Sequence, residues 1–177
     1  MKRSTWSVTV LCIAISMVIF NTFFGTKKEA ATEKQVVPVV KKVPPEKNQG
    51  KYATAITCMD GKGQGLVKNY IIEHYNIDWV DLITHSGANK ILAENFNTPI
   101  VAGMRENLGN SVFSSHKSKL IAIVGHSGCL VNKAGKNEQI IQLRECEKRI
   151  RSWGFGVKEK IILLFWTKNP RTIQRVW

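Results

Sequence analysis

Near-continuous apolar runs alternate with amphipathic stretches from about residue 51 to the end of the chain. Apolar runs of this kind are typical of buried parallel strands, and apolar residues three or four apart are typical of helices that cover a sheet. The predicted strands are residues 52–57, 78–84, 119–125 and 160–166, and the predicted helices are residues 63–75, 104–116 and 137–153. The pattern predicts an α/β fold with a mostly parallel four-stranded sheet and helices on both faces, joined by right-handed crossovers.

Two finer features follow from the same pattern. Residues 171–177 are a candidate extra edge strand, because the sequence TKNP turns the chain after the fourth predicted strand. The predicted apolar side of the last helix carries Ile140, Ile141, Leu143 and Ile150.

The N-terminal stretch has a different character. Residues 6–24 are uncharged and mostly apolar, and as a helix they are long enough to cross a bilayer core of about 30 Å. We therefore expect residues 1–25 to form an N-terminal transmembrane anchor, with a cleaved signal peptide as the alternative. Residues 26–50 form a Pro/Lys-rich tether, and residues 51–177 form the folded domain.

The side of the membrane is harder to predict. Lys2 and Arg3 precede the apolar stretch, but Lys27 and Lys28 follow it, so the lysine bias points both ways. A very short basic N-terminus is the common signal-anchor arrangement, which favours a domain on the exported, periplasmic face.

The chain is strongly basic, with a formal net charge of +13. Such a charge can attract nucleic acid or an anionic membrane surface. The lysines are scattered, however, and no motif combines basic and aromatic residues for nucleic-acid recognition. A solvated basic exterior is therefore favoured over a nucleic-acid partner.

Two of the four cysteines stand where chemistry is expected. Cys12 lies in the N-terminal apolar stretch, and Cys146 lies in the helical sequence RECEKR as a lone thiol. By contrast, Cys58 follows the first predicted strand directly, and Cys129 lies in the turn after the third.

The ends of the first and third predicted strands carry residues that bind zinc. Cys58 and Asp60 follow the first strand, while His126 and Cys129 follow the third. If these strands are neighbours, the four side chains meet at the carboxyl edge of the sheet, where open α/β folds place their sites. Two thiolates and one imidazole leave a fourth zinc position for water or a carboxylate. Two alternatives remain open, namely buried core cysteines and, in an exported domain, a disulfide.

Three motifs in order resemble a known family. They are C-M-D-G-K at residues 58–62, S-G-A-N at residues 86–89 and G-H-S-G-C at residues 125–129. Residues 52–166 are similar in order and spacing to the β-class carbonic anhydrases, whose motifs are C-x-D-x-R, R-N-A-G-N and H-x-x-C. The chain looks like a diverged member of that family.

The resemblance implies a Zn²⁺ cofactor held by Cys58, His126 and Cys129. It also implies a lyase that hydrates carbon dioxide reversibly to bicarbonate with a zinc-bound hydroxide, because zinc lowers the pKa of bound water toward about 7. Asp60 and Lys62 are then the candidate catalytic pair, in which Asp60 orients the hydroxide or carries its proton. A homodimer is expected from the resemblance alone.

The sequence departs from the family pattern where the catalytic pair is expected. Lys62 replaces the arginine of C-x-D-x-R, and a lysine lacks the planar two-donor fork that grips a carboxylate. Asp60 is therefore also a candidate fourth zinc ligand, and the alternative function is a catalytically inactive zinc-binding module tethered at the membrane. His85, Gly128 and Leu130 are further departures.

The other histidines are expected to play smaller parts. His74 and His116 fall on predicted helices and are expected to be surface or packing residues. His85 ends a strand at the edge that carries the metal ligands, but a hydrogen-bonded turn histidine is the simpler interpretation.

Overall fold

A computed structural model describes residues 50–94, 97–156 and 158–177 of the chain. They form an α/β fold around a five-stranded sheet with the order β2-β1-β3-β4-β5. Four of the strands are parallel to one another, namely β1 (Tyr52–Cys58), β2 (Trp79–His85), β3 (Leu120–His126) and β4 (Lys160–Lys168). Strand β5 (Arg171–Val176) pairs antiparallel with β4, so the predicted extra edge strand is confirmed.

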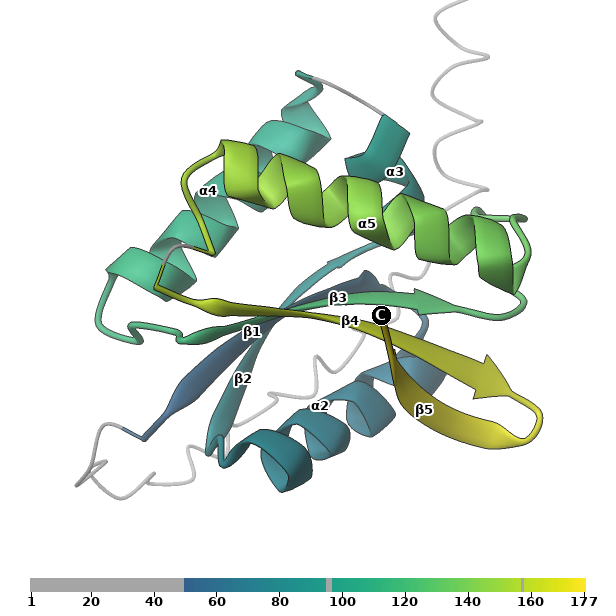
Figure 1. The fold of residues 1–177 in the computed structure, drawn as a ribbon, viewed down its shortest axis with the longest axis horizontal. Coiled ribbons are helices and arrows are strands. Elements are labelled where there is room, and N and C mark those ends of the chain that lie inside the picture. The colour runs from purple at the N-terminus through teal and green to yellow at the C-terminus, as the bar shows by residue number, and fades with distance from the viewer. Residues whose placement is uncertain (1–49, 95–96, 157) are drawn as a thin grey trace, which may run out of the picture. The chain divides into compact units, whose positions relative to one another are not determined.

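Helices cover both faces of the sheet, as the sequence predicted (Figure 1). Helix α2 (Gly61–Tyr75) packs on one face, where Val67 and Ile71 are fully buried. Helices α3 (Ala88–Glu94), α4 (Pro99–Phe113) and α5 (Lys136–Ser152) pack on the other. Strands β1 and β3, buried between these layers, are fully enclosed in their central residues, which explains their continuous apolar sequences.

The connection between β2 and β3 differs from the prediction. The predicted helix 104–116 starts earlier, at Pro99, and ends earlier, at Phe113. Thr98 caps its N-terminus by accepting a hydrogen bond from the Val101 N–H, and a proline is well tolerated in the first turn. Helix α3 was not predicted, because seven residues are too few to display a helical period.

The buried face of α5 also differs from the prediction. Leu143 and Ile150 are buried as expected, but Ile141 is 60% exposed, so its place on the apolar side was wrong. The face turned toward the sheet instead includes Gln139 and Gln142. These amides find hydrogen-bond partners below the helix, which offsets the cost of burying them.

The predicted anchor and tether lie outside the described residues, apart from Gly50. No helix within the described ranges is both long and apolar enough to span a bilayer.

Candidate metal centre

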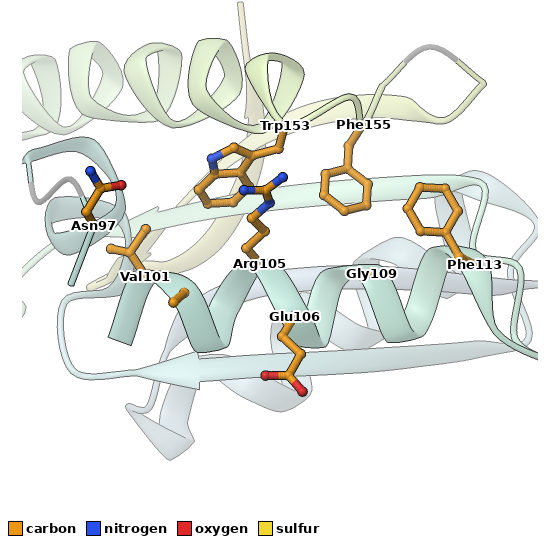
Figure 2. A pocket seen from close by; sticks show the side chains of 9 residues that line it. Asn97, Val101, Arg105, Glu106, Gly109, Phe113, Trp153 and Phe155 are labelled. Atoms are coloured by element: carbon orange, nitrogen blue, oxygen red, sulfur yellow. The ribbon is translucent and has the colours of Figure 1, made fainter. Parts of the chain in front are cut away.

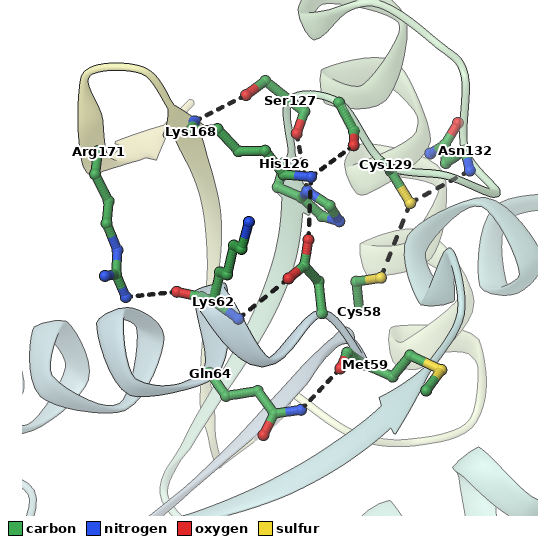
Figure 3. Close-up of polar contacts among 12 residues, drawn as sticks. Cys58, Met59, Lys62, Gln64, His126, Ser127, Cys129, Asn132, Lys168 and Arg171 are labelled. Carbon is green, nitrogen blue, oxygen red and sulfur yellow. Dashed lines mark hydrogen bonds and ion pairs between the residues drawn. The ribbon is translucent and has the colours of Figure 1, made fainter.

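The sheet order brings the two ligand motifs together. Strands β1 and β3 are direct neighbours, so Cys58 at the end of β1 lies beside the turn that follows β3. One ligand atom from each of Cys58, His126 and Cys129 lies within 4.8 Å of the others, and all three residues are buried. The two sulfur atoms are 3.8 Å apart (Figure 3). Two thiolates at about 2.3 Å from a tetrahedral zinc stand about 3.8 Å apart, so the pair fits that ion.

The His126 imidazole is held in the orientation that a metal ligand requires. Its Nδ1 lies 3.0 Å from the Ser127 carbonyl oxygen, which only accepts, so Nδ1 carries the proton and donates it. The ring stacks on Trp166, with centroids 4.5 Å apart and planes 5° from parallel. Its Nε2 is buried and has no hydrogen-bond partner among the described residues. This nitrogen therefore presents a free lone pair, which a metal ion would satisfy.

The turn between the two ligands of the third strand is tightly shaped. Gly128 has φ +60, a left-handed conformation that glycine adopts without strain. The turn brings Cys129 back beneath His126, and the Asn132 N–H points at the Cys129 sulfur at 3.3 Å.

The ionisation of the ligands also fits a cation. Burial raises the pKa of the Cys58 thiol, against the opposing hydrogen bonds from the backbone at Gly87 and Asp60. Burial likewise lowers the pKa of His126, so its imidazole is neutral at pH 7. A buried thiolate at Cys58 needs a compensating positive charge, and a divalent cation would supply it.

Asp60 lies beside this cluster as the N-cap of α2. Its Oδ1 accepts a hydrogen bond from the Lys62 N–H at 3.1 Å, and its Oδ2 lies 3.1 Å from the Lys168 Nζ (Figure 3). Burial opposes ionisation of the carboxyl, but these two contacts outweigh it and lower the pKa of Asp60. Within the described ranges, the ion pair at Asp60 thus belongs to Lys168, and Lys62 contributes its main-chain N–H. Lys168 is the last residue of β4, the strand next to β3, and lies two residues beyond the strand that the sequence predicts.

A network of buried amides supports the ligand turn. Gln139 accepts from the His126 N–H at 3.1 Å and donates to the His126 carbonyl oxygen at 2.9 Å. Asn89, from the S-G-A-N motif, donates to both Gln139 and Gln142, while Asn132 donates to Gln142 at 2.6 Å. The network joins α3 and α5 to the turn that carries His126 and Cys129. The two glutamines lie on a helix face that the sequence predicts to be apolar, so hydrophobic patterning does not identify them.

The cluster opens into a pocket of about 460 Å³. Its lining combines the three ligands with Asp60, Lys62, Lys168 and Ser86, and with the apolar residues Met59, Leu130 and Val131. A second pocket, of about 450 Å³, lies between α4 and the turn after α5 (Figure 2). There Arg105 lies over Trp153, and Phe113 stacks on Phe155, but the lining offers no thiol or imidazole. Of these two pockets, the first has the donor set for zinc.

The other histidines lie apart from the metal cluster. His85 pairs in register with Cys58, yet its Nδ1 is engaged by the Ser86 carbonyl oxygen at 3.0 Å, as expected of a turn histidine. His74 lies on α2 and stacks on Tyr70. His116 lies beyond the end of α4, where it contacts the Asp81 carboxylate at 2.8 Å, so its predicted helical position was wrong.

Cys146 is also remote from the ligands. It is fully buried on α5, where its thiol donates to the Asn89 carbonyl oxygen.

Comparison with known proteins identifies the family. A model of the family described as "Putative carbonic anhydrase" matches residues 48–176. A search of curated proteins finds no match. Among solved structures, the chain is similar to the β-carbonic anhydrase isoform I of Trichomonas vaginalis, with 14% identity, a TM-score of 0.48 and coverage of 96% of this chain and 97% of that one.

A second similar structure is the carbonic anhydrase of Streptococcus mutans, with 12% identity, a TM-score of 0.43 and full coverage of both chains. The family model spans most of the chain and includes all three motifs. The chain therefore belongs to the family described as putative carbonic anhydrase.

Proposed function

We propose that the chain is a zinc-dependent enzyme that converts carbon dioxide reversibly to bicarbonate. The observation that carries the proposal is the buried cluster of Cys58, His126 and Cys129, whose ligand atoms lie within 4.8 Å of one another. These three residues would hold the ion. A zinc ion bound there supplies Lewis-acid activation of water at neutral pH.

The remaining residues of the pocket suit this reaction. Asp60 is ionised at neutral pH because its pKa is lowered, so its carboxylate is available to accept a hydrogen bond or a proton from the reacting water. Met59, Leu130 and Val131 give the pocket an apolar side that suits carbon dioxide, which is small and uncharged. The basic side of the pocket, with Lys62 and Lys168, suits the bicarbonate anion.

Metal analysis combined with a hydration assay tests the proposal. The full chain is expected to hold about one zinc ion and to accelerate carbon dioxide hydration, and Cys129→Ala is expected to lose both. Cys146→Ala is the matched control, because Cys146 is an equally buried thiol away from the cluster. Zinc retained in full by Cys129→Ala would refute the site, and zinc without hydration in the native chain would refute the reaction.

A catalytically inactive zinc-binding module is the second candidate function. It is favoured by Lys62, which stands where the family pattern has arginine. If Lys62→Arg raises hydration from near zero, the module is the better description. Substantial hydration by the native chain excludes it.

Attachment to a membrane through residues 1–25 and the tether of residues 26–50 is also part of the proposal, motivated by the apolar run of residues 6–24. Fractionation of cells that express the full chain tests it. The chain should stay with membranes after a high-salt wash, and release by salt would rule out an anchor.

A further inference from the structure

We propose that Lys168 is a positioning residue that holds the Asp60 carboxylate away from Cys58, His126 and Cys129. It would take the part of the arginine of the C-x-D-x-R pattern, where this chain has Lys62. The inference rests on the proposed zinc site and deepens it. It assigns a role to a residue from the β4–β5 hairpin, which lies far along the chain from the C-M-D-G-K motif.

Both oxygens of Asp60 are held by separate groups. The Lys62 N–H binds Oδ1 at 3.1 Å, and the Lys168 Nζ binds Oδ2 at 3.1 Å. The carboxylate must leave at least one of these partners to reach a metal ion. The first partner is a main-chain group that fixes only one oxygen at the helix N-terminus, so the ammonium decides where the second oxygen points.

Lys168 is itself held by two residues of the turn between His126 and Cys129. Its Nζ donates to the Gly128 carbonyl oxygen at 2.8 Å, and its main-chain N–H donates to the Ser127 hydroxyl oxygen at 3.0 Å. The Ser127 N–H in turn donates to the Trp166 carbonyl oxygen at 3.0 Å. A lysine bound at both ends loses little further freedom when it grips a carboxylate, which answers the weakness expected of a lysine at this site.

Gly128 lies beside the Lys168 side chain. The Lys168 side chain passes within 3.6–3.9 Å of the position that a Cβ at Gly128 would occupy. A Cβ at this distance would be in ordinary contact with the lysine, so a longer side chain would compete for the same space. The departures from the family pattern at Lys62 and Gly128 therefore both lie beside the Asp60–Lys168 ion pair.

The hairpin that carries Lys168 is also tied to the helix that carries Asp60. The Arg171 guanidinium donates to the Lys62 carbonyl oxygen at 2.6 Å, in the first turn of α2 (Figure 3). Lys168 and Asp60 thus sit on elements that are joined directly. The Lys62 ammonium, by comparison, forms no ion pair within the described part of the chain.

Azide binding to the cobalt-substituted full chain tests the inference without measuring catalysis. Azide changes the visible spectrum of cobalt when it enters an open coordination position, and a carboxylate ligand at that position blocks it. Lys168→Met keeps the length of the side chain and removes its charge. We expect it to retain cobalt and to weaken azide binding at least tenfold. Lys148→Met is the control, because it removes an ion-paired lysine that does not line the pocket, and it should behave like the native chain.

Two further variants separate positioning from a loss of folding. Adding Asp60→Asn to Lys168→Met should restore azide binding, because asparagine still caps the helix but is a poor metal ligand. Lys168→Arg should stay close to native. Native-like azide binding by Lys168→Met, or a loss that Asp60→Asn does not restore, overturns the inference, as does a native chain that binds azide only after Asp60→Asn.

The result is distinguishable from failure of the proposed function. If the native chain binds cobalt and azide and the variants behave as expected, but no hydration is detected, then the positioning role stands and the reaction is refuted. If hydration is present and Lys168→Met binds azide normally, only the role of Lys168 fails. A chain that binds no metal refutes both.

Discussion

Gly63 offers a sharp test of how the fold supports the cluster of Cys58, His126 and Cys129. It lies in the first turn of α2, against the indole of Trp166. A Cβ at this position would lie 2.5 Å from Cε2 and Cζ2 of Trp166, whereas carbon atoms in contact stand about 3.5–4.0 Å apart. Gly63→Ala therefore requires the indole to move by about 1 Å. Trp166 is only 1% exposed, so the movement must push on its neighbours.

The size of the effect follows from two opposing contributions. Overpacking of a buried site costs about 1–3 kcal/mol, while alanine in place of glycine within a helix contributes up to about 1 kcal/mol. We expect Gly63→Ala to lower the free energy of unfolding by about 1–2 kcal/mol. Gly65→Ala is the matched control, because no heavy atom lies within 4 Å of its Cβ position. It should raise the free energy of unfolding by about 0.5–1 kcal/mol.

Urea denaturation measures the difference in unfolding free energy between the two variants, which should be about 1.5–3 kcal/mol. Because Trp166 stacks on the His126 ring, Gly63→Ala should also weaken zinc binding in competition with a chromophoric chelator, and Gly65→Ala should not. Equal stabilities for the two variants would show that Trp166 does not pack on α2 as described.

Two further predictions concern the buried polar groups of α5. Gln139→Leu leaves the His126 N–H and carbonyl oxygen without their Gln139 partner, so the free energy of unfolding should fall by about 2–4 kcal/mol. The control is Gln64→Leu at a more exposed site, where the fall should be less than about 1 kcal/mol. Similar losses in the two variants would contradict the buried network. Burial raises the pKa of Cys146 to about 12 from an ordinary 9.0, so above pH 9 the unfolded chain releases a proton that the folded chain keeps. The stability of the native chain relative to Cys146→Ala should therefore be constant below pH 9 and fall by up to about 1.4 kcal/mol per unit above it, as measured by urea denaturation at pH 8 and pH 10; parallel profiles would argue against the raised pKa.

The sequence predicted the sheet, and the meeting of Cys58, His126 and Cys129 at its edge, because both depend on short-range patterns. Apolar runs marked all four parallel strands, and the residues after two of them identified the cluster of Cys58, His126 and Cys129. Parallel neighbours place their carboxyl ends at one edge, so a motif after each strand was enough.

The surroundings of the cluster could not be read in the same way. Hydrophobic patterning predicted that Ile141 is buried, but its side chain is exposed. The same pattern did not predict that Gln139 is buried, because a buried amide is recognisable only from its hydrogen-bond partners. Lys168 resembles any other lysine in a basic chain until the β4–β5 hairpin brings it to Asp60. Interactions between side chains from distant elements depend on tertiary structure, which a local pattern does not encode.

The separation of the two cysteines along the chain has a consequence for folding. Cys58 and Cys129 are 71 residues apart, and β2, α3 and α4 all lie between them in the sequence. Contacts so distant in sequence carry a large loop-closure cost and form late. A chain made from its N-terminus cannot complete the ligand set until residue 129 has been synthesised and β3 has docked on β1. A bound ion would then link the two strands once the sheet has formed. It would raise the free energy of unfolding by about 4 kcal/mol when its concentration is a thousand times its dissociation constant.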